Sequence, residues 1–157
     1  MHWGEAVHQL DAKGRVFVPK RIQESLSCDT DGTRVAYLSR GQDSCLNLFS
    51  ESGFEQAVEE LKSGLFSGEE LRAAQRLFFA NTVRVELDGS GRLLIPEKLR
   101  TRAGIEKEVV FVGVGVKDRA EIWAREVWDR YESTHQEMLD RIDLILANRN
   151  PKPPVSG

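Results

Sequence analysis

The chain has 157 residues, of which 40% are hydrophobic and 30% charged, so it is long enough for one compact domain or two small ones. Its 22 basic and 25 acidic residues give a net charge of −3, so any binding of nucleic acid must come from a local basic patch. No apolar run approaches the ~20 residues of a membrane span, and the N-terminus has no signal-peptide pattern, so a cytoplasmic protein is expected.

The first expected element is a short strand over residues 6–10, which runs into a tight turn. The turn is formed by Leu10-Asp11-Ala12-Lys13-Gly14-Arg15. Asp11 is suited to begin it because its carboxylate can accept hydrogen bonds from nearby backbone N–H groups. Gly14 supplies the positive φ that a tight hairpin needs. Arg15 lies four residues after Asp11, so the two side chains can pair at the base of the turn.

Three apolar residues, 16–18, follow the turn and predict a short buried strand. Pro19 then stands where a first helical residue would, since it has no N–H to leave unsatisfied. Ile22 and Leu26 give this short helix one buried stripe. Two further strands are expected, over residues 35–38 and 45–49.

Two helices are expected next, over the residues that link the halves of the chain. The first opens at residues 50–53, and its apolar positions recur at helical spacing. These positions are Phe54, Val58, Leu61 and Leu65. The second begins at a capping box, with Ser67 as the N-cap and Glu70 three residues later. Its expected inward residues are Leu71, Ala74, Leu77 and Phe78.

The second half of the chain repeats the first. After a strand over residues 83–87, the stretch 87–96 reproduces residues 10–19 at an offset of 77, with Leu, Asp, Gly, Arg and Pro in the same places. A short helix opens at Pro96 and is expected to end at Gly104. Strands over residues 109–112 and 120–123 complete the copy. Each copy is thus a ββαββ unit, too small to bury its own face well, and the two are expected to pack as one pseudo-symmetric barrel.

A last helix is expected from Glu126, with an apolar stripe at heptad-like spacing. The stripe consists of Trp128, Tyr131, His135, Met138, Ile142 and Ile145. It either covers the domain or meets another subunit, and the sequence does not decide between them. The expected domain organisation is a first repeat at 5–51, linking helices at 52–80, a second repeat at 81–125, a C-terminal helix at 126–150 and a tail at 151–157.

Positive charge is concentrated at the two corresponding turns. Residues 12–23 contain four cations and no acid, and residues 91–104 contain four cations and one glutamate. The cations are Lys13, Arg15, Lys20 and Arg21 in the first copy and Arg92, Lys98, Arg100 and Arg102 in the second. A basic face on an acidic protein is typical of phosphate-backbone binding, and arginine in a two-stranded ribbon can reach guanine in the major groove. The alternative is that Arg15 and Arg92 only pair with Asp11 and Asp88 to hold the turns.

Residues 1 to about 131 resemble MraZ, a bacterial regulator family with two AbrB-like swapped-hairpin domains per chain. The resemblance rests on Leu10-Asp11-Ala12-Lys13-Gly14-Arg15 with Pro19, and on Asp88-Gly89-Ser90-Gly91-Arg92-Leu93-Leu94-Ile95-Pro96. Leu99-Arg100, Ala103-Gly104, Lys107-Glu108-Val109 and Glu121-Ile122-Trp123 match as well. The fold expected on this basis is mainly β and barrel-like, a swapped-hairpin pseudo-dimer with linking helices and a C-terminal helix.

The resemblance implies a sequence-specific DNA-binding transcriptional regulator, associated with the nucleoid. Members of the family bind short direct repeats ahead of the division and cell-wall gene cluster, usually as repressors, and assemble into rings. The implied partners are double-stranded DNA with such repeats and further copies of the chain, with no membrane. The expected DNA-binding residues are Lys13, Arg15, Lys20, Arg21, Arg92, Lys98 and Arg100, and the expected turn residues are Asp11, Gly14, Asp88 and Gly91.

An enzyme is not expected. Two symmetric aspartates are reminiscent of aspartic proteases, but the residues after each Asp do not match the Asp-Thr/Ser-Gly of that family. The chain has no complete dinucleotide-binding or Walker motif and no metal-ligand spacing, so no catalytic residue, metal or cofactor is assigned. The alternative function is an AbrB-like protein-binding module of the antitoxin type, which a disordered basic or apolar C-terminal arm would favour. The tail here has only about seven residues and is polar, which argues against it. A purely structural ring protein is a third possibility.

Overall fold

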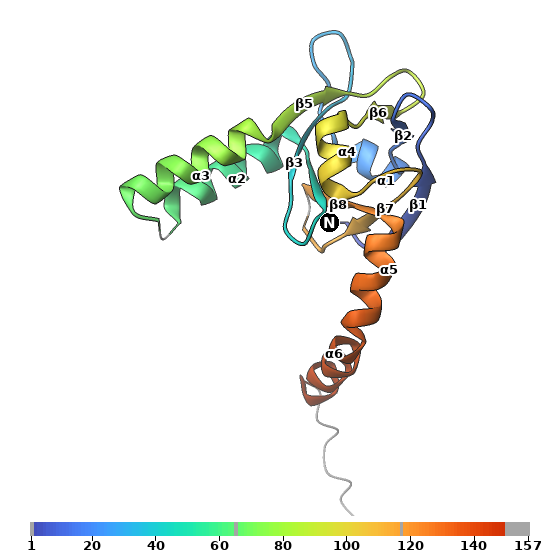
Figure 1. The fold of residues 1–157 in the computed structure, drawn as a ribbon, viewed down its shortest axis with the longest axis vertical. Helices are drawn as coiled ribbons and strands as arrows, with labels where there is room; N and C mark the ends of the chain where they lie inside the picture. The colour runs from blue at the N-terminus through green and yellow to red at the C-terminus, as the bar shows by residue number, and fades with distance from the viewer. Residues whose placement is uncertain (1, 65, 117, 150–157) are drawn as a thin grey trace, which may run out of the picture. The chain divides into compact units, whose positions relative to one another are not determined.

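The computed structural model describes residues 2–64, 66–116 and 118–149 (Figure 1). It has two compact units, Met1–Arg125 and Glu126–Gly157. The first copy of the repeat supplies β1 (Glu5–Gln9), β2 (Arg15–Phe17), α1 (Lys20–Ser25), β3 (Val35–Arg40) and β4 (Leu46–Phe49). The second copy supplies β5 (Thr82–Glu86), β6 (Arg92–Leu94), α4 (Glu97–Ala103), β7 (Glu108–Gly113) and β8 (Arg119–Ala124). Between them lie α2 (Glu51–Ser63) and α3 (Gly68–Ala80).

The large sheet has a strand order that is the same from either copy of the repeat. Its order is β1-β7-β8-β4-β3-β5, and every neighbouring pair is antiparallel. β1 of the first copy pairs with β7 of the second, and β5 of the second pairs with β3 of the first. Each copy therefore completes its sheet with a strand of the other. The expected β-rich fold of tandem ββαββ units is confirmed.

The small sheet consists of β2 and β6, with Val16 opposite Leu93 at its centre. These two residues are counterparts at the offset of 77, so the pseudo-two-fold relation between the copies passes through this pair. Both are almost fully buried, as are Val18 and Ile95. Burying these four side chains, at roughly 1.5–3 kcal/mol each, fixes the ribbon on the core and leaves its other face outward.

The two short helices begin one residue later than the sequence predicts, and only the predicted end of the second, at Gly104, is confirmed. Pro19 is the N-cap of α1 and Pro96 is the N-cap of α4. Gly104 ends α4 in the left-handed region with φ 66°, where glycine has no Cβ penalty. The counterpart end of α1 is Leu26 in extended backbone.

The helices α2 and α3 form a hairpin that extends from the strands (Figure 1). α2 begins at Ser50, whose hydroxyl accepts from the Gly53 N–H, and α3 begins at the expected capping box of Ser67 and Glu70. The prediction that Leu77 points inward is wrong, because this side chain is 66% exposed and no residue of α3 is fully buried. The reason is that α3 packs on α2 rather than on a sheet, so only a narrow face is covered. The predicted apolar position Leu65 lies outside the described residues.

The C-terminal segment does not form the single helix that the sequence predicts. α5 (Arg125–Thr134) and α6 (Gln136–Arg149) are separated at His135. Six large apolar side chains of α6 are between 45% and 63% exposed, so the stripe has no cover within this unit. They are Met138, Leu139, Ile142, Leu144, Ile145 and Leu146. The expected tail at 151–157 lies outside the described residues.

Among the described residues, no helix has both the length and the apolar character needed to cross a membrane.

Candidate nucleic-acid interface

The first turn is organised by the carboxylate of Asp11. Its Oδ1 accepts from the backbone N–H groups of Lys13 and Arg15, both at 2.9 Å. Its Oδ2 accepts from Nε of Arg15 at 2.7 Å. Gly14 has φ 84° and donates its N–H to the Asp11 carbonyl. The expected pairing of Asp11 with Arg15 at the base of the turn is confirmed.

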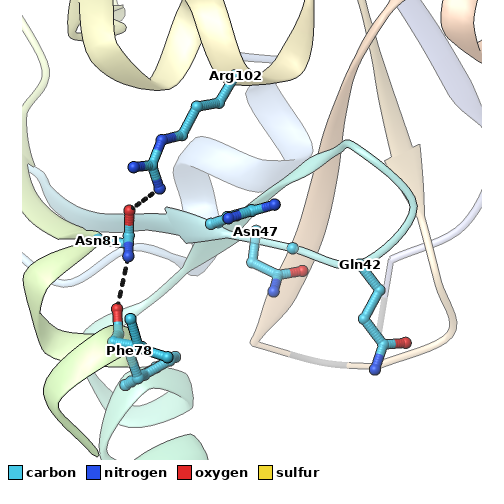
Figure 2. Close-up of a pocket in the computed structure, with 8 residues that line it drawn as sticks. Gln42, Asn47, Phe78, Asn81 and Arg102 are labelled. Carbon is cyan, nitrogen blue, oxygen red and sulfur yellow. Dashed lines mark hydrogen bonds between the residues drawn. The ribbon is translucent and has the colours of Figure 1, made fainter. Parts of the chain in front are cut away.

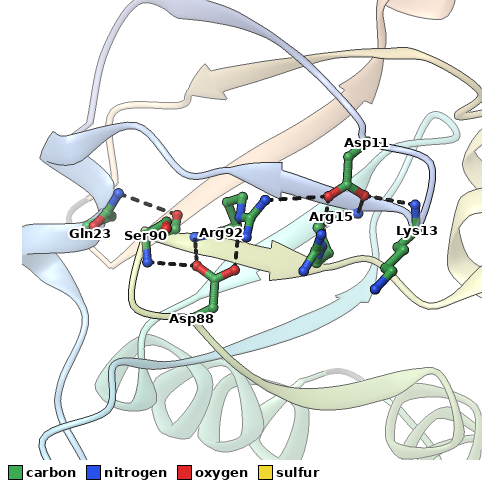
Figure 3. Close-up of polar contacts among 8 residues, drawn as sticks. Asp11, Lys13, Arg15, Gln23, Asp88, Ser90 and Arg92 are labelled. Carbon is green, nitrogen blue, oxygen red and sulfur yellow. Dashed lines mark hydrogen bonds and ion pairs between the residues drawn. The ribbon is translucent and has the colours of Figure 1, made fainter.

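The second turn repeats these contacts at the offset of 77 (Figure 3). Asp88 Oδ1 accepts from the N–H groups of Ser90 and Arg92, at 2.9 and 3.0 Å. Its Oδ2 accepts from Nε of Arg92 at 2.9 Å. Gly91 has φ 83°. Two turns with the same hydrogen bonds, built from an aspartate, a glycine and an arginine, explain why these residue types recur.

Hydrogen bonding keeps both turn carboxylates ionised. The backbone N–H of Arg15 is the largest cause that lowers the pKa of Asp11 from 3.8 to about 2. The pKa of Asp88 is lowered too, with the backbone N–H of Arg92 as the largest cause. Hydrogen bonds to the charged form account for both shifts. Each arginine is therefore held through its Nε by an anion.

Each turn is braced by the short helix of the other copy. The guanidinium of Arg100, on α4, lies so close over Gly14 that a Cβ there would be 2.8 Å from Arg100 Cζ. Arg100 Nε also donates to the Ile95 carbonyl at 2.9 Å. Gln23 on α1 is the counterpart of Arg100, and its amide lies over Gly91 and donates to the Val18 carbonyl at 2.7 Å. Arg100, which the sequence assigns to DNA binding, thus also has a structural role.

The outward face of the β2–β6 ribbon alternates arginine with exposed apolar residues. Arg15 lies opposite Leu94, and Phe17 lies opposite Arg92. Phe17 and Leu94 are counterparts at the offset of 77. Phe17 is 48% exposed and Leu94 is 49% exposed, although both are large apolar side chains. The guanidinium of Arg92 lies 5.6 Å from the centroid of the Phe17 ring. This face, made of Arg15, Phe17, Arg92 and Leu94, is called the ribbon face below.

The prediction that residues 16–18 and 93–95 are wholly buried strands is therefore wrong at Phe17 and Leu94. A ribbon packed on one side alternates inward and outward residues, so its middle apolar residue shares the outward face with arginine. The sequence Arg-apolar-apolar-apolar at residues 15–18 contained the signal for an outward Phe17. If Arg15 faces outward, the third residue shares its face of the strand, and only the second and fourth can face the core. Phe17, Leu94 and Gln23 are the interface residues that the sequence reasoning missed.

The two copies of the turn are not equivalent. Arg92 Nη1 reaches across to Asp11 Oδ2 at 3.6 Å, in addition to its own partner Asp88. Arg15 has a single carboxylate partner within the described part of the chain, Asp11. The ion pairs of the two turns therefore differ.

Of the remaining predicted cations, Lys20, Arg21 and Lys98 lie on the first turns of α1 and α4, and Lys13 lies in the turn between β1 and β2. Lys13, Lys20, Arg21 and Lys98 are all exposed. None of them takes part in the ion pairs found among residues 2–64, 66–116 and 118–149. The Arg21 guanidinium lies over the Trp3 ring, 3.9 Å from its centroid, so it is held near the N-terminus rather than at a turn. Lys13 projects from the first turn next to Arg15 (Figure 3).

The described residues contain no group of three or more His, Cys, Asp or Glu side chains arranged to hold a metal ion. The arrangement instead offers fixed guanidinium groups, exposed lysines and two apolar side chains on one narrow ribbon. Such a ribbon can contact an extended polyanion through its charges and base edges through its arginines.

Comparison with known proteins agrees with this geometry. The family described as "MraZ protein, putative antitoxin-like" matches residues 1–77 and 78–145. A relative from Carboxydothermus hydrogenoformans, named "Transcriptional regulator MraZ", is 38% identical over 93% of this chain and 100% of the relative. Relatives of the same name from Pelotomaculum thermopropionicum and Caldanaerobacter subterraneus subsp. tengcongensis are 40% and 37% identical, covering 94% and 96% of this chain and 99% of each relative. The chain therefore belongs to the MraZ family.

Proposed function

We propose that the chain is a sequence-specific DNA-binding transcriptional regulator, located in the cytoplasm and associated with the nucleoid. It acts as a repressor of the division and cell-wall gene cluster and binds tandem promoter repeats as a ring-shaped homo-oligomer. The names of the relatives support a regulator of transcription and a role other than catalysis. The ribbon face is the observation that supports the choice of DNA as the partner.

The proposed contacts divide between phosphates and bases. Arg15 uses Nε for its turn aspartate, which leaves both terminal nitrogens for guanine O6 and N7. Arg92 uses Nε for Asp88 and Nη1 for Asp11, which leaves Nη2 for a base. Phe17 and Leu94 flank them and would contact thymine methyl groups. The lysines at 13, 20 and 98 and Arg21 would neutralise phosphates.

One ribbon face is small, so a single subunit is expected to bind weakly. Several subunits in one assembly can occupy successive repeats of the operator, and the second contact then forms at high effective concentration. This is the physical reason for proposing a ring on direct repeats rather than a monomer on a single site.

The test is a salt titration of binding to DNA from upstream of the chain's own gene, with a scrambled duplex of equal length. Arg15→Ala is expected to lose the preference for the native duplex, roughly 10- to 100-fold for one bidentate contact. Lys13→Ala is expected to weaken both duplexes alike and to reduce the salt slope by about one contact. Arg76→Ala, an exposed arginine of α3, serves as the matched control.

If the wild-type chain bound both duplexes equally and weakly, the binding would be non-specific attraction to phosphates, and the proposal of sequence-specific binding would be wrong. Loss of folding or assembly in Arg15→Ala would instead support the alternative in which Arg15 only holds its turn. The backbone N–H groups that hold Asp11 remain in this variant, so folding is expected to persist.

A second candidate is a protein-binding module of the antitoxin type, which the family description "putative antitoxin-like" favours. In that function the exposed apolar side chains of the helix α6 would contact a protein partner. Deletion of residues 136–157 distinguishes the two functions. Specific binding of a duplex with a single repeat by the deletion variant agrees with DNA recognition by the ribbon face. Co-purification of a stoichiometric protein partner that only the full chain retains would instead favour the antitoxin type.

A further inference from the structure

A basic pocket of about 390 Å³ lies in the first unit at the C-terminal end of α3 (Figure 2). Arg40 from the end of β3 and Arg102 from α4 both line it, together with the side-chain amides of Asn47 and Asn81. Leu77 and Phe78 form an apolar wall. None of the residues found to line it is acidic, although the chain has 25 acidic residues.

Neither arginine of the pocket is neutralised by a carboxylate in the described part of the chain. Arg102 donates from Nη1 to the amide oxygen of Asn81, whose own Nδ2 donates to the Leu77 carbonyl at 2.7 Å. Arg40 and Arg102 are both absent from the ion pairs among the described residues. Both arginines are exposed and line the same pocket, so an anionic ligand between them would interact favourably with both charges.

The pseudo-symmetry indicates that the fold does not require these arginines. The counterpart of Arg102 at the offset of 77 is Ser25. Arg40 corresponds to Gly113, because Val35 and Glu108 face the counterpart residues Glu86 and Gln9 in the sheet. Glycine and serine thus occupy the same structural positions in the other copy.

A third residue of the pocket, Asn47, also differs in charge from its counterpart in the other copy. Asn47 and Glu121 face each other where β4 meets β8 and are counterparts in the two copies. The pocket combines Arg40 and Arg102 with the neutral amide of Asn47, whereas the pseudo-symmetric positions hold Gly113, Ser25 and the acid Glu121. The pocket is therefore lined by more basic residues than its pseudo-symmetric counterpart, with Glu121 beside Asn47 as the neighbouring acid.

We propose that this pocket binds a small phosphorylated ligand. Its phosphate would lie between Arg40 and Arg102, since guanidinium groups match phosphate oxygens with paired N–H donors. An attached ring or apolar group would lie against Leu77 and Phe78. The amides of Asn47 and Asn81 supply further donors.

The position of the pocket connects it with the first turn. Arg102 is two residues after Arg100 on α4, and Arg100 braces the turn at Gly14. A ligand held by Arg102 would therefore contact the same helix that supports this turn. The binding itself does not depend on the proposed function and is tested without DNA.

The experiment titrates the full chain with phenyl phosphate, inorganic phosphate and phenol, and follows the side-chain amide signals of Asn47 and Asn81 by NMR. Saturable binding is expected for phenyl phosphate, weaker binding for inorganic phosphate and none for phenol. Arg102→Gln and Arg40→Gln are each expected to weaken phenyl phosphate about tenfold or more, because each removes charge-assisted hydrogen bonds. Arg76→Gln, with an exposed arginine elsewhere on α3, is expected to bind as the wild type does.

Two outcomes overturn the proposal. One is that the wild type and Arg40→Gln bind phenyl phosphate with equal affinity. The Arg40→Gln variant is informative because it keeps the hydrogen bond between Arg102 and Asn81. The other is absence of ligand binding together with a loss of DNA affinity in both arginine variants, which would assign the phosphate contact to the DNA backbone.

Discussion

The carboxylate of Asp11 holds its turn mainly by accepting hydrogen bonds from backbone N–H groups of the turn. Its pKa is lowered to about 2, and the backbone N–H of Arg15 is the largest single cause, ahead of the hydrogen bond from the Arg15 guanidinium. Because the folded-state pKa is depressed, the carboxylate stabilises the folded chain above pH 3.8, and this contribution is lost as the pH falls from 3.8 through about 2.

We therefore expect Asp11 to be mostly ionised at pH 3.8, where an ordinary aspartate is half protonated. An NMR pH titration of the carboxyl carbon measures this. Arg15→Ala keeps the backbone donor and is expected to keep most of the depression. If the variant were half protonated at pH 3.8, the guanidinium rather than the backbone would be what holds the carboxylate.

Gly14 combines a positive φ with a close neighbour, and these two effects can be separated. Gly32 has φ 79° and open space where a Cβ would stand, whereas Gly14 has φ 84° and the Arg100 guanidinium over it. Gly32→Ala is expected to cost about 1–2 kcal/mol from backbone strain alone. Gly14→Ala is expected to cost more, because Arg100 must also move away from the Ile95 carbonyl. Denaturant unfolding checks both, and equal losses would mean that Arg100 does not brace the turn.

The turn residues could be predicted from the sequence because their roles depend on local chemistry. Asp, Gly and Arg are needed at fixed offsets by the turn itself, and the repeat supplied a second instance. Phe17 and Leu94 were placed wrongly, because three apolar residues in a row are typical of a strand covered on both sides. The opposing signal was the arginine two residues before each of them, which shares their face of the strand. The basic pocket also went unpredicted, since it joins Arg40 and Arg102 from opposite halves of the chain.

At the scale of elements, the α2–α3 hairpin depends on one aromatic side chain. Phe54 stacks on Tyr37 at 4.4 Å and on Phe78 at 5.9 Å between ring centroids. It also meets Phe49 and Phe79. This contact set joins the hairpin to the sheet, while α3 itself has no fully buried residue.

Phe54→Ala is consequently expected to destabilise the chain by about 2–3 kcal/mol, somewhat less than a fully buried phenylalanine because Phe54 is half-buried. Phe66→Ala, at a side chain that is 46% exposed, is the control and is expected to change stability little. Chemical denaturation followed by circular dichroism measures both. Similar values for the two variants would mean that the aromatic cluster does not anchor the hairpin.

The extent of the C-terminal helices illustrates a limit of periodicity. The apolar stripe continues through His135, and this predicted one helix. In the structure His135 Nδ1 contacts the Tyr131 carbonyl at 2.8 Å, and the backbone N–H groups around it shift to nearer acceptors. A side chain that competes for a backbone carbonyl can end a helix, and hydrophobic spacing contains no information on it.

At the scale of the whole molecule, the repeat predicted the pseudo-symmetry but not the exchange of strands. Spacing alone allows each copy to form its own sheet. The observed pairing of β1 with β7 and of β5 with β3 places every copy's first strand against the other copy. The family resemblance pointed to the swapped arrangement, because a known fold carries long-range pairing that a local pattern cannot.

The exposed apolar side chains of α6 carry the last prediction, which concerns assembly. Six large side chains on one helix of 14 residues are at least 45% exposed, more than a soluble monomer usually leaves in one patch. We expect them to contact further copies of the chain, as the ring proposal requires. Light scattering of a Leu139→Lys and Leu146→Lys double variant should then give a smaller particle than the wild type. The control is Glu137→Lys, which adds a lysine to the same helix without removing an apolar side chain.

Assembly and DNA binding are coupled in this proposal through the number of operator repeats. The wild type should bind a duplex with three repeats on the order of 100-fold or more tighter than a duplex with one repeat. The double variant should lose this gain yet bind the single repeat as the wild type does, because the ribbon face is unchanged. A double variant that keeps both its particle size and the gain would exclude α6 as the subunit contact. A wild type that binds one and three repeats equally would exclude the ring on repeats, whatever the role of α6.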